Sequence, residues 1–345
     1  MYSLLAALVL VATPAAAEHH AILGPQFARG VDPSATRDII RRADAAIGRR
    51  PGAIARLHTE GTLPGKGIRD ISLKAKQDQP IVLDLALAWR LTGNRRYLDQ
   101  AGRYLAAWVN LYQMSFNPID ETDFDKLLLA TDLTEADLPP ALRAKLDRFW
   151  RRMAAGYLDA MDTVPKSQMN NWQSHRVKLA MMAAFQTGDA GLIGRARAAF
   201  RKQVAANIHP DGSVFDFGER DALHYVTYDL DPLLMAAIAA KTHGEDWYRW
   251  QSATGSSLAA AVRWLEPYAR GTQTHTEFAN SRVAFDRQRA AAGQGEYAPH
   301  AWDRGNAVPT FSLAALCDPA WAPLARQLAD QTGRRPAAWT QFYRG

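Results

Sequence analysis

The chain has 345 residues, of which 48% are hydrophobic and 22% charged, and its formal net charge at pH 7 is +6. This composition, with ten Trp, excludes a disordered or fibrous protein and is enough for one large core or two ordinary ones. The single cysteine, Cys317, excludes an internal disulfide and any metal site built from several cysteines.

The first residues are typical of a secretory signal. An apolar run from Leu4 to Val11 is followed by Pro14 and by three small residues, Ala15 to Ala17, although no Lys or Arg precedes the run. The run is too short to cross a membrane, and no later segment reaches the ~18 continuous apolar residues of a spanning helix. We therefore expect a signal peptide at 1–17 and a periplasmic or secreted chain, not inserted in a membrane, at 18–345.

The basic charge of the exported chain favours an acidic partner. Its Lys and Arg residues are spread over the predicted helices without a long basic run, and nucleic acid is not expected in that compartment. An acidic polysaccharide or an anionic lipid fits this pattern better. A solvated surface that happens to be basic is the alternative.

A pattern of helix, turn and helix recurs along the chain. In the first pair the turn is Thr92-Gly93-Asn94, where glycine suits the positive φ of a helix C-cap. After an amphipathic helix at 34–50, such pairs are predicted at 80–91 with 95–112, at 180–187 with 190–200, and at 230–240 with the residues up to Trp247. This recurrence predicts an array of antiparallel helical hairpins, and no linker divides it into two domains.

Three segments interrupt the helices. Residues 57–72 form a long loop rich in glycine, and its basic residues Lys66 and Arg69 suit a lid over an anionic ligand. The acidic segment 115–125 lacks the spacing of a calcium loop and is expected to cap the next helix. Residues 270–293 alternate in polarity and are expected to be extended.

The densest group of polar side chains lies in QMNNWQSHRVKLAMMAA, from Gln168 to Ala184. In a helix that starts at Asn171, His175 lies one turn further on the same face, and Trp172 and Arg176 share the neighbouring face. The apolar tail of the segment buries the helix. Its polar first turn is either a capped entrance or the wall of a site for an anionic ligand.

A second polar group lies in DGSVFDFGERDALHYVTYDLDPLL, at 211–234. Here Arg220, His224, Tyr225 and Tyr228 are side chains suited to proton transfer and carboxylate recognition. The alternatives are that both tyrosines are core aromatics and that Arg220 pairs with a neighbouring carboxylate. His275 and Glu277 have the spacing of two metal ligands, but a satisfied pair is favoured.

Four motifs together resemble the alginate lyase superfamily, of which polysaccharide lyase family 5 is the best-known member. They are LALAWRLTGNRRYLDQAGRYLAAW, NPIDET, MNNW and DGSVFDFGERDALHY, and they cover the chain from about Lys66 to Leu234. The resemblance implies an all-α fold, the α/α toroid, which is an incomplete barrel of antiparallel helical hairpins forming one catalytic domain.

The resemblance also implies roles for individual residues. In that family an Asn and an Arg neutralise a uronate carboxylate, a His assists, and a Tyr transfers protons. By motif these are Asn171, Arg220 and Tyr225, whereas Trp172 stands where the family has its His, and the nearest imidazole is His175. The expected catalytic set is Asn171, His175, Arg220 and Tyr225, and the expected substrate-binding set is Lys66, Arg69, Trp172, Arg176, His224 and Tyr228.

These residues suit β-elimination in a 4-linked polyuronate such as alginate. Loss of the C5 proton next to a carboxylate builds up negative charge, which an amide and a guanidinium can stabilise without a metal or cofactor. One alternative is a glycoside hydrolase, with two carboxylates from Asp211, Asp216, Glu219 and Asp221. Another is a protein that binds or exports acidic polysaccharide without catalysis.

Overall fold

The computed structural model of the chain describes residues 19–24, 27, 33–164 and 168–344, so the predicted signal peptide lies outside the described residues. The α-helices are α1 (Pro33–Ala46), α2 (Arg69–Lys76), α3 (Asp78–Thr92), α4 (Arg95–Leu111), α5 (Phe124–Thr134), α6 (Pro140–Asp162), α7 (Asn171–Thr187), α8 (Ala190–Asn207), α9 (Phe215–Arg220), α10 (Leu223–Thr242), α11 (Leu258–Arg270), α12 (Ala284–Ala291), α13 (Val308–Cys317) and α14 (Ala322–Thr332). Short 3-10 helices are η1 (Glu135–Asp137), η3 (Gly295–Tyr297), η4 (Arg304–Ala307), η5 (Pro319–Trp321) and η6 (Ala338–Phe342). Two strands, β1 (Thr276–Glu277) and β2 (His300–Ala301), pair antiparallel.

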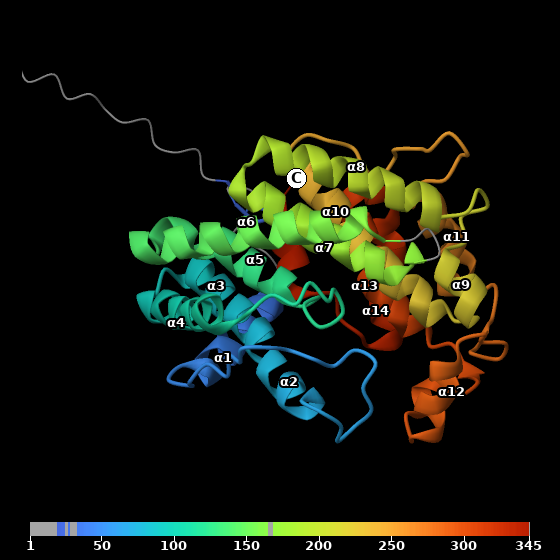
Figure 1. Cartoon of the computed structure of the whole chain (residues 1–345), viewed down its shortest axis with the longest axis horizontal. Helices are drawn as coiled ribbons and strands as arrows, with labels where there is room; N and C mark the ends of the chain where they lie inside the picture. Colours follow the sequence, from blue (N-terminus) through green and yellow to red (C-terminus); the bar gives the residue numbers. More distant parts are fainter. Residues whose placement is uncertain (1–18, 25–26, 28–32, 165–167, 345) are drawn as a thin grey trace, which may run out of the picture.

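The helices form an inner and an outer set (Figure 1). Helices α3, α5, α7, α10 and α13 pack side by side in this order, while α1, α4, α6, α8 and α14 pack against them from outside. Helices α7 and α10 are buried over most of their length, which explains why their apolar residues surround the helix and do not form one stripe. The predicted all-α fold of antiparallel helical hairpins is confirmed.

Two of the three predicted hairpin turns are present. Gly93 and Gly188 both adopt left-handed conformations, with φ of 69° and 64°, and the side chains of Asn94 and Asp189 cap the helices that follow. The third prediction is wrong. After α10 the segment up to Ser257 contains no α-helix, and the ring of Trp247 packs 4.7 Å from that of Phe200.

The acidic segment before α5 does not cap that helix. Asp123 is the N-cap residue, but its side chain accepts no capping hydrogen bond. Instead, the buried Asp120 accepts hydrogen bonds from the backbone N–H groups of Thr59 and Glu60, at 2.6 and 3.0 Å. Glu121, also buried, accepts one from the hydroxyl of Tyr112 at 2.8 Å. The segment therefore fixes the start of the long loop that was predicted as a lid.

The prediction of an extended segment at 270–293 is wrong for its second half. Residues 284–291 form α12, and extended pairing is confined to β1. The sequence AFDRQRAA explains the helix, since Ala, Arg and Gln favour helices and Asp286 lies in the first turn, where a carboxylate stabilises the helix dipole.

The described N-terminal segment is fixed by one carboxylate. Ala21, Ile22 and Leu23 are fully buried, and their backbone N–H groups donate to Asp132 at 2.7–2.8 Å. Among the described residues, no helix is long and apolar enough to span a membrane.

Gly212 provides a test of how the turn before α9 is packed. Its φ is +93°, and a Cβ atom there would lie 2.6 Å from the carbonyl oxygen of Ala260 and 2.9 Å from Cβ of Trp264. Gly93 has a similar positive φ, but a Cβ there would meet nothing within 4 Å. We expect Gly93→Ala to cost roughly 1–2 kcal/mol of unfolding free energy, from backbone strain alone. Gly212→Ala should cost about 1–3 kcal/mol more, because α11 must also move.

Urea unfolding of both variants measures this difference. Equal losses for Gly93→Ala and Gly212→Ala would show that the turn does not press against α11.

Candidate active site

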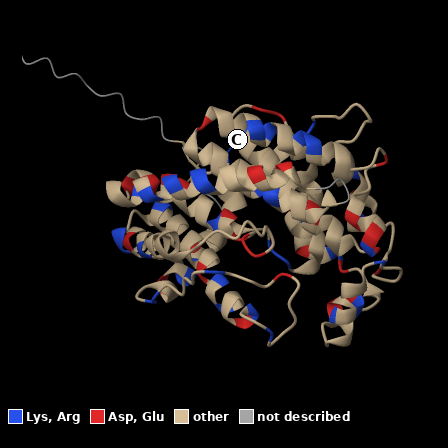
Figure 2. Ribbon diagram, in the orientation of Figure 1, with Lys and Arg blue, Asp and Glu red and all other residues tan. Residues whose placement is uncertain are grey.

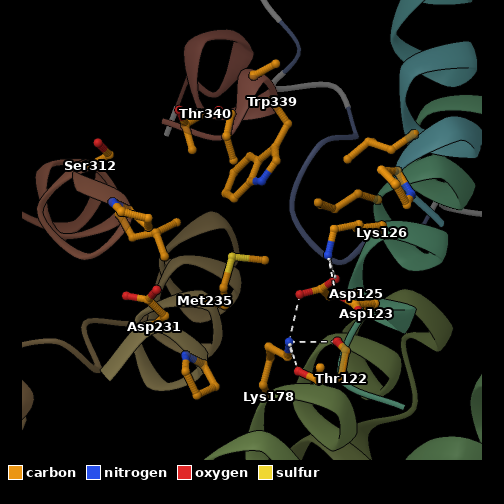
Figure 3. Close-up of a pocket in the computed structure, with 18 of the residues that line it drawn as sticks. Thr122, Asp123, Asp125, Lys126, Lys178, Asp231, Met235, Ser312, Trp339 and Thr340 are labelled. Carbon is orange, nitrogen blue, oxygen red and sulfur yellow. Dashed lines mark hydrogen bonds and ion pairs between the residues drawn. The ribbon is translucent and has the colours of Figure 1, made fainter. Parts of the chain in front are cut away.

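A cavity of about 430 Å³ lies among the inner helices (Figure 3). Its walls come from the first half of α5, α7, α10 and α13, with contributions from α1, α3 and η6. Leu83, Leu129, Met235 and Trp339 make much of the wall apolar.

Charged side chains line one side of the cavity. Lys178 contacts Asp125 at 2.7 Å, and Asp123 lies 2.6 Å from Lys126 and 3.1 Å from Lys76. Burial would raise the pKa of Asp123, but the ammonium groups of Lys126 and Lys76 hold it well below its usual range. Asp123 therefore stays ionised, and Figure 3 shows the contacts that Lys178 and Lys126 make with this acidic segment.

The imidazole of His175 lies in the wall of this cavity. The residue is 4% exposed, and its Nδ1 atom lies 2.7 Å from the hydroxyl of Thr122. Burial, followed by the charge of Lys178, lowers the pKa of His175 well below its ordinary value. His175 is therefore neutral at physiological pH.

His175 and the predicted tyrosines belong to one cluster of rings. The ring of Tyr228, which also lines the cavity, lies 4.4 Å from that of His175. Tyr225 packs edge-on against Tyr228 at 6.3 Å, and His224 stacks on Tyr228 at 6.2 Å. Tyr225 and His224 are not among the residues that line the cavity. The structure thus brings His175 and Tyr228 into direct contact and places Tyr225 behind Tyr228.

Two guanidinium groups contact Tyr225. That of Arg220 lies over the ring, 3.9 Å from its centroid, and that of Arg289 donates to the hydroxyl at 3.2 Å. Asp221, with a φ of 49°, makes the corner between α9 and α10 that folds Arg220 back onto this ring. Burial raises the pKa of Tyr225 despite the charge of Arg220, so its hydroxyl is protonated at neutral pH.

A buried carboxylate, Asp216, joins the two polar groups of the sequence. It accepts hydrogen bonds from the backbone N–H and the side-chain amide of Asn171, at 2.6 and 2.7 Å. Arg220 lies 3.9 Å from Asp216 and is hydrogen-bonded to Asp286 of α12. Of the partners that the sequence suggested for Arg220, the structure confirms Asp216, and Asp286 is a further one.

A second buried carboxylate, Asp229, lies in the same network. It accepts hydrogen bonds from the hydroxyl of Ser174 and the amide of Asn207, both at 2.6 Å. Burial and the nearby charge of Asp216 raise the pKa of Asp229 to about 8. The network ties α7 and α8 to α10 beneath the first turn of α7.

The other predicted binding residues lie away from the cavity. Trp172 and Arg176 contact each other, with the guanidinium 5.7 Å from the indole centroid. Lys66 is exposed, and Arg69 lies 3.5 Å from its neighbour Asp70. None of these four residues lines the cavity, and neither do Asn171 and Arg220 of the expected catalytic set.

His275 and Glu277 each bind a protein group, but they are not a surface pair, because Glu277 is buried and its Oε2 atom has no partner in the described residues. The ring of His275 bonds the carbonyl oxygen of Asp221 at 3.0 Å, and Glu277 accepts from the backbone N–H of His224 at 2.8 Å. Across the described part of the chain, no group of three or more His, Cys, Asp or Glu could hold a metal ion.

Several residues of the site were missed by the sequence analysis. Asp286 and Arg289 lie more than 60 residues beyond Arg220 and Tyr225, in a segment expected to be extended. Thr122 was not considered. Lys178 could have been found, because it is a lone charge within the apolar tail of α7.

Comparison with known proteins identifies the family. The sequence model described as alginate lyase matches residues 30–275. The chain belongs to the alginate lyase family. Its match to that family confirms the resemblance drawn from the four motifs.

A polysaccharide lyase of Stenotrophomonas maltophilia (strain K279a) is 31% identical over 172 residues, which is 47% of this chain and 51% of the relative. The match thus spans about half the length of this relative.

Solved structures of alginate lyases share the fold. An alginate lyase from Bacteroides ovatus has a TM-score of 0.65 and 17% identity, over 90% of this chain and 93% of that one. Alginate lyase A1-III from Sphingomonas species A1 has a TM-score of 0.52 and 19% identity, over 81% of this chain and 92% of that one. A variant of A1-III complexed with tetrasaccharide has a TM-score of 0.53 and 18% identity, over 79% of this chain and 89% of that one.

The raised pKa of Asp229 predicts how stability of this member of the family depends on pH. The pKa of Asp229 is about 8 in the folded protein and about 4 in the unfolded chain. The folded state therefore binds this proton more tightly, so the stabilisation is complete below about pH 4 and is lost as the pH rises through about 8. We expect the free energy of unfolding to fall between pH 5 and pH 9, and Asp229→Asn to reduce this fall by at least about 1 kcal/mol.

Urea unfolding at both pH values checks this expectation. Asp99→Asn is the matched control, because the side chain of Asp99 is 61% exposed on α4. If Asp229→Asn shows the same pH dependence as Asp99→Asn, the carboxyl group of Asp229 does not gain its proton on folding.

Proposed function

We propose that the chain is a periplasmic or secreted polysaccharide lyase that cleaves a 4-linked polyuronate by β-elimination. The substrate would be alginate, polymannuronate or a related polymer that contains glucuronate. The observation that carries this proposal is the contact between the imidazole of His175 and the phenol of Tyr228 in the wall of a cavity with cationic groups. Membership of the alginate lyase family and the tetrasaccharide bound to a variant of A1-III support it.

The reaction needs groups that stabilise negative charge on the substrate carboxylate while the C5 proton leaves. In our proposal Asn171 and Arg220 do this, each with N–H groups beyond those that bind Asp216 and Asp286. Donors of this kind are typically worth about 3–4 kcal/mol of barrier each. His175 assists them, and Tyr225 transfers the proton to the leaving oxygen.

The position of Tyr228 makes it a second candidate for proton transfer. It lines the cavity and contacts His175, whereas Tyr225 lies behind it with its hydroxyl held by Arg289. Burial raises the pKa of both hydroxyls, so either would enter the reaction as an acid. Comparing variants of the two tyrosines therefore decides which phenol transfers the proton.

A glycoside hydrolase is less well supported. It needs two carboxyl groups free to face one glycosidic bond. The carboxylates that line the cavity have partners within the described residues: Asp84 with Arg42, Asp123 with Lys126, Asp125 with Lys178, and Asp231 with the hydroxyl of Thr310.

The acidic polymer would be recognised outside the cavity as well. The net charge of the chain is +6, and Lys and Arg are interspersed with Asp and Glu along the ribbon (Figure 2). The expected loop ends earlier than residue 72, because α2 begins at Arg69. We propose that Lys66, in the loop, and Arg69, at the start of α2, bind the polymer beyond the reacting sugar, and that Trp172 and Arg176 offer a further contact. Neither a metal nor a cofactor takes part in this scheme, and nucleic acid is not a partner.

Absorbance near ~235 nm tests the proposed reaction, because elimination leaves a conjugated unsaturated uronate. We expect purified protein to raise this absorbance with at least one of polymannuronate, polyguluronate, glucuronan and glycosaminoglycans. New reducing ends without the absorbance would indicate a hydrolase. Binding without either signal would indicate a non-catalytic protein that binds polysaccharide.

Replacing each tyrosine by phenylalanine tests which phenol transfers the proton. Either change removes one hydroxyl and keeps the ring packing. Replacing the phenol that acts as the general acid should lower kcat about 100-fold or more, with little change in KM. We expect this loss in Tyr225→Phe. A loss in Tyr228→Phe alone would move the role to Tyr228, and near-normal turnover in both variants would contradict the mechanism.

A further inference from the structure

We infer that His175 serves this site as a neutral hydrogen-bond donor through Nε2, not as a base, and that Thr122 and Lys178 are positioning residues that impose this tautomer. The inference rests on the proposed lyase function for the role of the donor. The tautomer itself follows from the hydrogen bonds around the ring.

The first step is the ammonium group of Lys178. It lies 2.8 Å from the carbonyl oxygen of Thr122, 2.9 Å from the hydroxyl oxygen of Thr122 and 2.7 Å from Asp125. An ammonium group has three hydrogens and no acceptor, so it must donate to the hydroxyl oxygen of Thr122. Lys178 is 4% exposed, which keeps water from replacing these contacts.

The second step is the hydroxyl group of Thr122. It has one hydrogen, and its remaining hydrogen-bond partner in the described residues is Nδ1 of His175 at 2.7 Å. If Nδ1 carried a proton, the hydroxyl oxygen would accept two hydrogen bonds and its own hydrogen would lack an acceptor. The arrangement that satisfies every group has Thr122 donating to Nδ1, which places the ring proton on Nε2.

The backbone of α10 offers an acceptor beside this ring. Pro232 lies inside this helix and has no N–H, so the carbonyl group of Tyr228, four residues earlier, lacks its helical donor. The backbone of Tyr228 raises the pKa of His175, although burial and the charge of Lys178 lower it further. Nε2 nevertheless makes no hydrogen bond of good geometry to any described residue, although it is fully buried.

Because His175 lines the cavity and its Nε2 has no partner in the described residues, we assign a ligand oxygen as the acceptor for this N–H. In the proposed reaction the substrate carboxylate gains electron density as the C5 proton leaves, and a neutral imidazole can donate to it without giving up its proton. The charged groups that face His175 are Lys178 on α7, Asp123 and Asp125 at the start of α5, Lys76 on α2 and Asp231 on α10. With its acceptor nitrogen occupied by the hydroxyl of Thr122, His175 would not take the C5 proton in this reaction.

Substitution at His175 separates a donor from a base. The amide of His175→Gln can donate from about the position of Nε2 but cannot accept a proton at neutral pH, and His175→Ala can do neither. We expect His175→Gln to keep kcat within about tenfold of the parent and to keep the shape of its pH profile, while His175→Ala loses about 100-fold or more. Equal losses in both variants would overturn the role as donor.

Thr122 offers a matched pair for the positioning role. Thr122→Ser keeps the hydroxyl group, and Thr122→Val keeps the shape without it. We expect near-normal kcat in Thr122→Ser and a loss in Thr122→Val, with circular dichroism to show that both variants fold. Equal activity in the two variants would contradict a positioning role for the hydroxyl.

Nitrogen NMR of the His175 ring in the full chain, without substrate, reads the tautomer directly. We expect the proton on Nε2 from pH 5 to pH 8, and a changed tautomer mixture in Thr122→Val. A proton on Nδ1, or formation of the imidazolium in this range, would overturn the inference. If the parent cleaves no polyuronate the proposed function fails, whereas the NMR result still decides the tautomer.

Discussion

The carboxylate of Asp216 is the contact on which the rest of the site depends. It binds both the backbone N–H and the amide of Asn171, and so ties the first turn of α7 to α9. Because α9 ends at Arg220, this one link also places the guanidinium over Tyr225. A buried carboxylate is costly unless its hydrogen bonds are satisfied, and here the donors are the groups proposed to bind substrate. The network that organises the fold and the network that would bind a carboxylate are thus the same.

Burial and neighbouring charges together set the protonation states around the cavity, and they shift the pKa of one carboxyl group down and of another up. The carboxylates beside lysines stay ionised, as in Asp123, whereas Asp229, which has only neutral donors, keeps its proton to higher pH. Burial disfavours the charged form of each ring, so the imidazole of His175 is neutral and the phenols of Tyr225 and Tyr228 are protonated. A neutral imidazole beside protonated phenols suits a reaction in which protons move between ring hydroxyls and a sugar.

The sequence predicted the features that depend on local spacing. Gly93 and Gly188 mark helix ends because positive φ favours glycine, and Asn171 begins α7 because Asn170 caps it. Helical spacing also placed His175 on the face of Asn171, one turn beyond Trp172. The contacts of Thr122 with His175 and of Asp286 with Arg220 span 53 and 66 residues, and no local pattern encodes them. The two turns of α12 were missed because polar alternation over a short segment fits a strand as well as a helix.

Pro232 shows how a site can be encoded away from the residues that form it. The acceptor that it leaves free belongs to the backbone of Tyr228, so every amino acid at position 228 would supply the same carbonyl group. Only a change four residues further along the helix, from proline to a residue with an N–H, would occupy that carbonyl. A survey of side chains at the cavity wall would assign Pro232 to packing, although its missing N–H also leaves a backbone carbonyl of α10 without its helical donor. Divergence within such a fold can therefore change the polarity of a binding site through residues whose side chains contain no polar atom.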